Sequence, residues 1–227
     1  MKPELRIGVI DSGHAAHQRV AGGRRFFLQP EGIGQGPLQE DALGHGSAII
    51  EAIGQRAPTA QVYVAQVFDR RAVTSAAQVS AALHWLLVQD VRLINLSLGL
   101  RQDRDLLRQA CAAAEARGVL LCASSPAQGE AVFPASYPGV LRVTGDARCS
   151  AQQWSWLNTA QADFAACVRG SSPGQSGASL GCAALSGHIA AYLGAHPQAD
   201  KAQVRQWLQD NAHYQGPERR QQPCTPS

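Results

Sequence analysis

Five short runs of branched apolar residues, separated by helical patterns, constrain the fold of this 227-residue chain more than any other feature. They lack the alternation of apolar and polar residues that is typical of a sheet with one wetted face. The predicted strands are therefore buried on both faces and pair in parallel, as in sheets covered by helices on both sides. The runs are Leu5 to Ile10, Val62 to Phe68, Leu93 to Leu98, Val119 to Ala123 and Val140 to Thr144.

Helical periodicity lies between and after these strands. Apolar side chains recur at intervals of three and four residues from Val79 to Leu86 and from Leu106 to Ala114. The stretch from Ala178 to Leu193 is small and apolar all round, which predicts a buried central helix, and the spacing from Val204 to Leu208 predicts a surface helix. We therefore expect an α/β three-layer sandwich with a mainly parallel central sheet.

A single domain is expected. No repeat or interdomain linker interrupts residues 1–214, whereas residues 215–227 lose all periodicity and are expected to form a loose C-terminal tail. The 45% of hydrophobic and 16% of charged residues suit a compact globular domain that buries a core.

Charge and hydropathy argue against two classes of partner. The 20 basic and 17 acidic residues give a net charge of +3 without a basic stripe, so no nucleic-acid partner is predicted. The pairs Arg24-Arg25, Arg70-Arg71 and Arg219-Arg220 are interpreted as parts of solvated loops. No apolar run approaches the roughly 20 residues of a membrane span, and the N-terminus leads into a strand instead of a signal peptide. The sequence thus predicts no membrane partner and a cytoplasmic location.

The cysteines predict neither a zinc site nor an established disulfide framework. They form no CxxC pair and have no closely spaced histidine, so we interpret them as mostly buried thiols. Acidic loops suited to calcium are also not evident. We therefore expect no metal and no cofactor. The six cysteines are Cys111, Cys122, Cys149, Cys167, Cys182 and Cys224.

Three segments carry reactive side chains at the ends of predicted strands or the starts of predicted helices, where this architecture exposes them. They are VIDSG with Asp11, LGHGSAI with His45 and GASLGCAALSGH with Ser179. A serine becomes nucleophilic when an imidazole takes its proton, and a carboxylate must hold that imidazole in the right tautomer. Alone, each residue could be a turn former, a helix cap or a packing residue, but together they predict a catalytic triad. The other histidines, His14, His17, His84, His188, His196 and His213, are interpreted as structural or surface residues.

The order Asp11, His45, Ser179 and the flanking motifs resemble the subtilisin family of serine endopeptidases, over roughly Arg6 to Asn211. The motifs are INLSLG, FPASYPGVLRVTG and GASLGCAALSGHIAAYL. The resemblance implies that Asp11 orients His45, that His45 acts as general base and then general acid, and that Ser179 forms the acyl-enzyme. It also implies an extended peptide or protein substrate, held by main-chain hydrogen bonds along Ser97, Leu98 and Gly99.

The oxyanion site departs from the family pattern. An ungapped match puts Ala127 where the family has a donor Asn and Pro126 where it has the preceding Gly, and Ala178 replaces the Thr before the nucleophile. Alanine has no side-chain donor, so the remaining oxyanion candidates are Ser179, through its main-chain N–H, and the Ala127-Gln128 segment. The prediction is a slow enzyme that tolerates low turnover, or one with a substitute donor. The candidate substitutes are Ser124, Ser125, Gln128 and Gln175.

The substrate-pocket rim also differs from the family. Leu100 follows the SLG motif where a second glycine is usual, and the opposite wall is Ser124, Ser125 and Pro126. A bulkier, stiffer rim predicts a narrowed pocket for small or slender side chains. Glu51 lies on the predicted helix of His45 where the family has a small residue, and both an arginine partner and a basic substrate residue remain open for it.

The resemblance and these departures predict a dedicated peptide-maturation or leader-removing endopeptidase. The short chain is similar to the compact subtilisin-like proteases of bacterial peptide-modification and quinohemoprotein amine dehydrogenase maturation systems. Two alternatives remain open: a silent or slow peptide-binding module with the subtilisin fold, and acyl or peptide transfer by the same residues. The sequence does not determine the oligomeric state.

Overall fold

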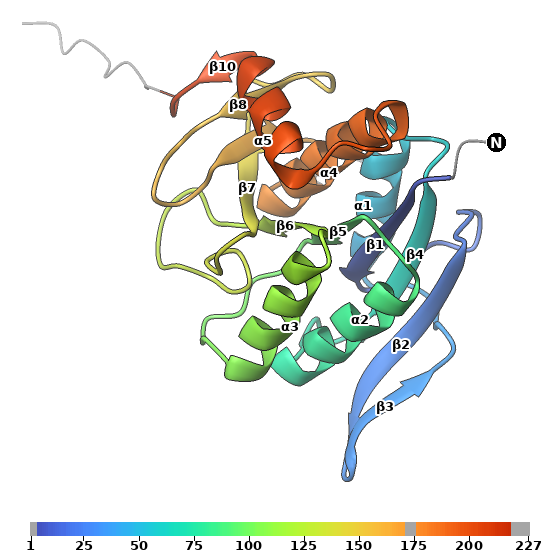
Figure 1. Ribbon diagram of the computed structural model, residues 1–227. Coiled ribbons are helices and arrows are strands. Elements are labelled where there is room, and N and C mark those ends of the chain that lie inside the picture. Colours follow the sequence, from blue (N-terminus) through green and yellow to red (C-terminus); the bar gives the residue numbers. More distant parts are fainter. Residues whose placement is uncertain (1–3, 171–175, 219–227) are drawn as a thin grey trace, which may run out of the picture.

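The computed structural model describes residues 4–170 and 176–218, which form one ten-stranded sheet with helices on both faces (Figure 1). The strand order is β10-β8-β9-β7-β6-β5-β1-β4-β2-β3. Neighbouring strands are parallel except in the pairs β2 with β3 and β8 with β9. The predicted three-layer α/β sandwich with a mainly parallel sheet is confirmed.

The predicted strands and helices all form, within a few residues of their expected ends. The strands are β1 (Arg6–Asp11), β2 (Gly22–Gln29), β3 (Gly32–Gly36), β4 (Gln61–Gln66), β5 (Leu93–Leu96), β6 (Leu120–Ser124), β7 (Leu141–Asp146), β8 (Trp154–Trp156), β9 (Phe164–Cys167) and β10 (Tyr214–Gln215). The helices are α1 (His45–Gly54), α2 (Ala76–Val88), α3 (Asp105–Ala116), α4 (Ala178–Ala195) and α5 (Lys201–Asp210).

Alternate side chains of the central strands enter two separate cores. On β1, Ile7 and Val9 pack with α1, α4 and α5, whereas Ile10 packs with α2 and α3 on the other face. This alternation follows from the two-residue period of a strand, and it explains why these strands show continuous apolar runs.

α4 is the central helix of one layer and packs against α1 and β7 (Figure 1). In the described part of the chain it alone has the length and apolar character of a membrane span, but 67% of it is buried inside the fold. A Cβ at Gly181 would lie 2.2 Å from the Thr144 carbonyl oxygen, so a glycine is needed for this close approach to β7. The apolar character of α4 is that of a core helix.

Five strands outside the predicted set extend the sheet at its two ends. The hairpin of β2 and β3 is rich in glycine, arginine and glutamine, and its one apolar run, Phe26 to Leu28, is too short to predict a strand. At the opposite edge, Gln215 lies in β10 and the N–H of Gly216 donates to the Trp156 carbonyl oxygen. The tail expected from Gln215 therefore does not begin there, because main-chain pairing with β8 holds these residues.

Candidate active site

Asp11 and His45 meet where β1 ends and α1 begins. His45 Nδ1 lies 2.7 Å from Asp11 Oδ1, and the Asp11 side chain is fully buried while 41% of the His45 side chain is exposed. A carboxylate only accepts hydrogen bonds, so Nδ1 carries the proton and donates it to Asp11. The other ring nitrogen, Nε2, is then left as an acceptor.

Asp11 also favours the charged form of His45. The hydrogen bond to Asp11 raises the pKa of His45, burial opposes this, and the negative charges of Asp11 and Asp41 add to the rise. The Ser12 N–H donates to Asp11 Oδ1 at 2.7 Å, while Oδ2 is buried without a hydrogen-bond partner in the described residues. A proton arriving on His45 is therefore well stabilised.

Asp41, which sequence reasoning missed, holds the start of α1. Its carboxylate accepts the Ser47 N–H at 2.8 Å, the Ser47 hydroxyl at 2.6 Å and the Gly44 N–H at 3.0 Å. It also accepts the Ser12 hydroxyl at 2.8 Å. Burial raises the pKa of Asp41, but these hydrogen bonds outweigh it and hold the pKa below its usual value. The available signal was an acidic residue just before the predicted helix start, where it can satisfy free N–H groups.

A close approach of two glycines sets the position of His45. A Cβ at Gly46 would lie only 2.3 Å from the Gly13 carbonyl oxygen, which real Cβ atoms do not tolerate. The Gly46 N–H donates to the Ser12 hydroxyl at 2.8 Å. The turn after β1 and the first turn of α1 are therefore in direct contact.

Ser179 lies in the first turn of α4 and is tied to the end of β5. Its hydroxyl donates to the Ser97 carbonyl oxygen at 3.2 Å, and the Ser97 hydroxyl donates to the Ser179 carbonyl oxygen at 3.0 Å. Asn95 donates to the Ser97 hydroxyl and accepts from the Ser186 hydroxyl, each at 2.9 Å. This buried polar chain fixes the start of α4 against β5.

A cavity of about 360 Å³ lies beside the Asp11–His45 pair. Asp11, His45 and Ser97 line it, together with the apolar side chains of Leu43, Phe68 and Ala72. Ser97 is therefore shared between this cavity and the contacts of Ser179. The Ser179 hydroxyl bonds to Ser97 and not to His45 in this structure, so proton transfer to the imidazole requires the hydroxyl to leave that carbonyl.

The residues of the predicted substrate-binding segment differ in whether their main-chain groups already form hydrogen bonds within the protein. Gly99 is exposed, whereas both main-chain groups of Leu100 pair with Phe133, at 2.7 and 2.8 Å. The Ser124 hydroxyl lies 3.4 Å from the Leu98 carbonyl oxygen and donates to it. The main chain of Leu100 is therefore not free to pair with a peptide, whereas Gly99 is accessible to one.

The predicted substitute donors for the oxyanion differ in position and in whether they already form hydrogen bonds. The hydroxyls of Ser124 and Ser125 already donate to carbonyl oxygens, that of Ser125 to Gln161 at 2.6 Å. Pro126 is half-buried. Ala127 and Gln128 line a separate cavity of about 790 Å³ beside β7. Gln175 lies outside the described residues.

The remaining predicted features are structural or unassigned. Glu51 is exposed on α1 and forms no ion pair within residues 4–170 and 176–218. The His188 ring packs against Trp154, with ring centroids 4.9 Å apart, and accepts a hydrogen bond from Arg56.

No group of three His, Cys, Asp or Glu residues in the described parts is arranged to hold a metal ion. The cysteines in those parts are free and buried, and Cys224 lies outside them.

Sequence comparison relates this chain to known peptidases. The sequence profile of the subtilase family matches residues 5–223. A thermostable alkaline protease of Halalkalibacterium halodurans is 32% identical over an alignment of 151 positions, which covers 61% of this chain and 40% of that protein. The chain thus spans well under half the length of this curated relative.

Two solved structures share the fold. The prenylagaramide maturation protease PagA superposes with a TM-score of 0.63 and 19% identity, over 89% of this chain and 80% of that one. A lanthipeptide protease gives a TM-score of 0.66 and 16% identity, over 90% of this chain and 78% of that one. At these identities the likeness concerns the fold alone.

Proposed function

Because the chain belongs to the subtilase family, we propose that it is a serine endopeptidase that uses Asp11, His45 and Ser179. The 2.7 Å contact between Asp11 and His45, on the wall of a cavity that Ser97 also lines, carries this proposal. The two hydrogen bonds between Ser97 and Ser179 bring the nucleophile to the same edge of the sheet.

The reaction follows from this arrangement. Ser179 Oγ attacks the carbonyl carbon of the scissile peptide bond while His45 Nε2 takes its proton, and Asp11 stabilises the resulting imidazolium. The oxyanion forms near the N-terminus of α4, whose free N–H groups and dipole favour negative charge. His45 then protonates the departing amine. Water then attacks the acyl carbon while His45 takes a proton from it, and His45 gives that proton to Ser179 Oγ as the ester bond breaks.

The weakened oxyanion site supports a low turnover. Loss of the side-chain donor costs about 10²–10³ in rate in subtilisin itself, and the hydroxyls of Ser124 and Ser125 are engaged elsewhere. We infer that the enzyme acts on a dedicated peptide, in maturation or leader removal, where a slow rate suffices. The fold neighbours named as maturation and lanthipeptide proteases support this substrate class.

Covalent labelling tests the proposal. A fluorophosphonate probe is expected to label the protein at Ser179, and neither Ser179→Ala nor His45→Ala should be labelled at a comparable rate. Incubation with candidate leader-bearing peptides should give two products whose masses add to the peptide plus water. Full labelling of a folded Ser179→Ala variant would exclude Ser179 as the nucleophile.

A second candidate, a peptide-binding module, is favoured by one observation. The Ser179 hydroxyl donates to Ser97 and leaves His45 Nε2 without a bond to the nucleophile. A binder predicts peptide affinity that is equal in the native protein and Ser179→Ala, with no labelling and no products. Product masses also separate hydrolysis from acyl transfer, because a transferred acyl group adds the mass of the acceptor instead of water.

A further inference from the structure

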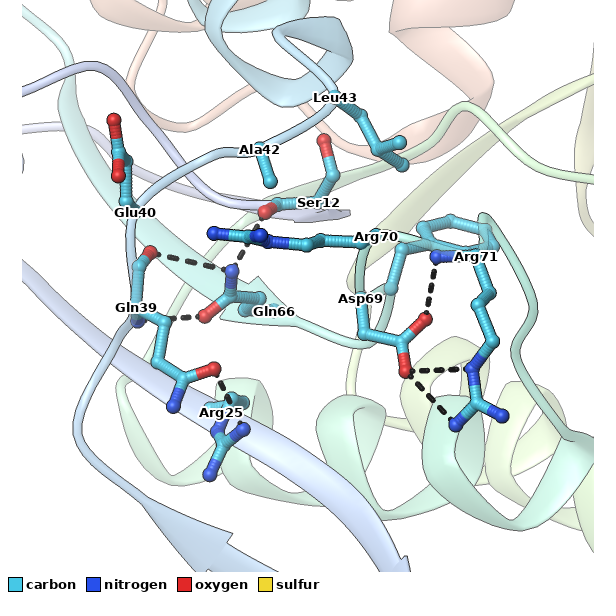
Figure 2. A pocket seen from close by; sticks show the side chains of 11 residues that line it. Ser12, Arg25, Gln39, Glu40, Ala42, Leu43, Gln66, Asp69, Arg70 and Arg71 are labelled. Atoms are coloured by element: carbon cyan, nitrogen blue, oxygen red, sulfur yellow. Dashed lines mark hydrogen bonds and ion pairs between the residues drawn. The ribbon is translucent and has the colours of Figure 1, made fainter.

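A second cavity, of about 460 Å³, adjoins the one beside His45 (Figure 2). The two cavities share Leu43 and Phe68, and Ser12, the residue after Asp11, lines the second one. A peptide lying along the active-site cavity is therefore next to this pocket. We call it the arginine pocket, because Arg25, Arg70 and Arg71 line it.

The arginine pocket holds more positive charge than its own carboxylates neutralise. Arg71 pairs with Asp69, which also accepts the Arg71 N–H at 2.8 Å. Arg70 reaches across the pocket in Figure 2 and forms no ion pair among the described residues. The Glu40 carboxylate points away from the Arg70 guanidinium in the same view, and no ion pair joins the two.

The Arg25 guanidinium is held in place by its neighbours, but one of its N–H donors has no acceptor among the described residues. Its guanidinium stacks over the Phe27 ring, 4.4 Å from the ring centroid, and one terminal nitrogen donates to Gln39 at 2.7 Å. Its Nε is buried and lacks a hydrogen-bond partner within the described parts of the chain. Because this Nε is buried, a carboxylate in the pocket would meet the terminal nitrogens of the guanidinium, which are charged donors.

The wall behind these arginines is rigid. The Gln66 amide donates to the Ser12 carbonyl oxygen at 2.7 Å and accepts the Gln39 N–H at 2.8 Å. Gln66 is also paired in register with Asp11 across β4 and β1. The pocket is therefore fixed relative to the active site by sheet hydrogen bonds.

We propose that the arginine pocket binds an acidic side chain of the peptide substrate, with its carboxylate between Arg25 and Arg70. This inference rests on the proposed peptidase function. A guanidinium presents paired N–H donors that match a carboxylate, and side chains on one face of an extended peptide recur about every 7 Å. Adjacent cavities can thus take side chains from one substrate. The expectation that Arg24 and Arg25 lie in a loop is wrong, because both residues lie in β2, whereas Arg70 and Arg71 are exposed outside the helices and strands, as expected.

A series of peptides that carry one glutamate at successive positions tests whether the arginine pocket recognises an acidic side chain. The probes are fluorescein-labelled decapeptides in which one glutamate moves through an alanine, serine and leucine background, each paired with its glutamine counterpart. At one position the native protein is expected to cleave the glutamate peptide about tenfold faster than the glutamine peptide, as for a charge-assisted hydrogen bond. This ratio should fall to about one in Arg25→Gln combined with Arg70→Gln.

Two variants separate recognition from folding. Arg24→Gln removes the same charge from the exposed neighbour, whose guanidinium bonds to Gln35 of β3, and it should keep the full preference. Arg70→Gln alone removes an exposed side chain that lacks an ion pair in the described residues, so it should fold normally and still reduce the ratio. Equal ratios in the native protein and the double variant, or no glutamate preference at any position, overturn the proposal.

Binding to Ser179→Ala keeps the two proposals apart. One outcome is that no peptide is cleaved, but anisotropy shows tighter binding of a glutamate peptide that depends on Arg25 and Arg70. This outcome supports the arginine pocket and contradicts the peptidase function. If peptides are cleaved without glutamate preference, the peptidase stands and the pocket falls. Absence of both cleavage and arginine-dependent binding contradicts both.

Discussion

A single buried carboxylate, that of Asp11, sets the chemistry of the proposed catalytic imidazole. It accepts the Nδ1 proton of His45, which leaves Nε2 free to take a proton from Ser179. Asp41 adds a second negative charge nearby and at the same time caps the start of α1. Asp11 thus sets the tautomer of His45, and Asp41 holds the start of the helix that carries His45.

The raised pKa of His45 predicts the pH dependence of cleavage. Activity requires neutral His45, so kcat/KM should rise with pH along a limb centred above 6.5, because the hydrogen bond to Asp11 stabilises the protonated form. Asp11→Asn should move this limb to lower pH and reduce kcat by about 10⁴, as in other triads that lose the carboxylate. The measurement is a pH–rate profile of both proteins, and a limb that does not move contradicts the assignment.

Stability should depend on pH through a different histidine, His188. Burial, together with the Arg56 charge, lowers the pKa of His188 from 6.5 to about 4, and the nearby His213 adds to this. The unfolded chain therefore binds a proton first. Stability from neutral His188 is complete above pH 6.5 and is lost as pH falls toward 4, by at most about 3 kcal/mol.

The variant His188→Gln tests this contribution, because glutamine keeps an acceptor for Arg56 without a titratable ring. Denaturant unfolding between pH 7 and 4 should show a smaller decline for the variant than for the native protein. Parallel declines would show that other groups carry the acid sensitivity.

At the scale of elements, two helix starts and two strand ends build the site. α1 presses against the turn after β1, and α4 is bound to the end of β5 through Asn95, Ser97 and Ser186. The first contact places His45 beside Asp11, and the second places Ser179 beside Ser97. Substitutions at these contacts should therefore affect catalysis by moving His45 or Ser179.

Gly46→Ala tests the approach of α1 to the turn after β1. The added Cβ would lie 2.3 Å from the Gly13 carbonyl oxygen, so α1 must shift. We expect a loss of about 1–3 kcal/mol in stability and a fall of about 100-fold in kcat/KM, since His45 moves with the helix.

Gly54→Ala is the matched control in the same helix. A Cβ at Gly54 meets nothing within 4 Å, so the change should stabilise the protein by up to about 1 kcal/mol and leave kcat/KM unchanged. Chemical unfolding and peptide cleavage measure both effects. Equal behaviour of the two variants would show that the Gly46 contact does not position His45.

At the scale of the whole molecule, the parallel sheet gathers the site at one edge. β1 lies between β4 and β5, with Asp11 in register with Gln66 and Ile10 in register with Leu96. Ser97 therefore follows β5 beside Asp11. The carboxyl ends of adjacent parallel strands lie at the same edge, which is where α/β proteins bind ligands.

The fold is expected to be stable without a divalent cation. The described residues contain no cluster of three metal-ligating side chains, and two apolar cores cover the sheet. Addition of EDTA should leave the thermal unfolding midpoint unchanged within about 1 °C. A fall of several degrees that calcium restores would disprove this expectation.

By itself, the sequence determined the central strands, the helices and the three candidate catalytic residues. Buried parallel strands and a core helix leave continuous apolar patterns, and the reactive residues follow those patterns directly. The β2 and β3 hairpin left no such pattern, because glycine, arginine and glutamine surround its short apolar run, Phe26 to Leu28. Only the tertiary structure decided the role of Asp41, the engagement of the Ser124 and Ser125 hydroxyls, and the presence of Arg25 and Arg70 on the wall of one cavity. These depend on distances between segments far apart in the chain, and hydrophobic periodicity records burial of a segment but not which polar groups it meets.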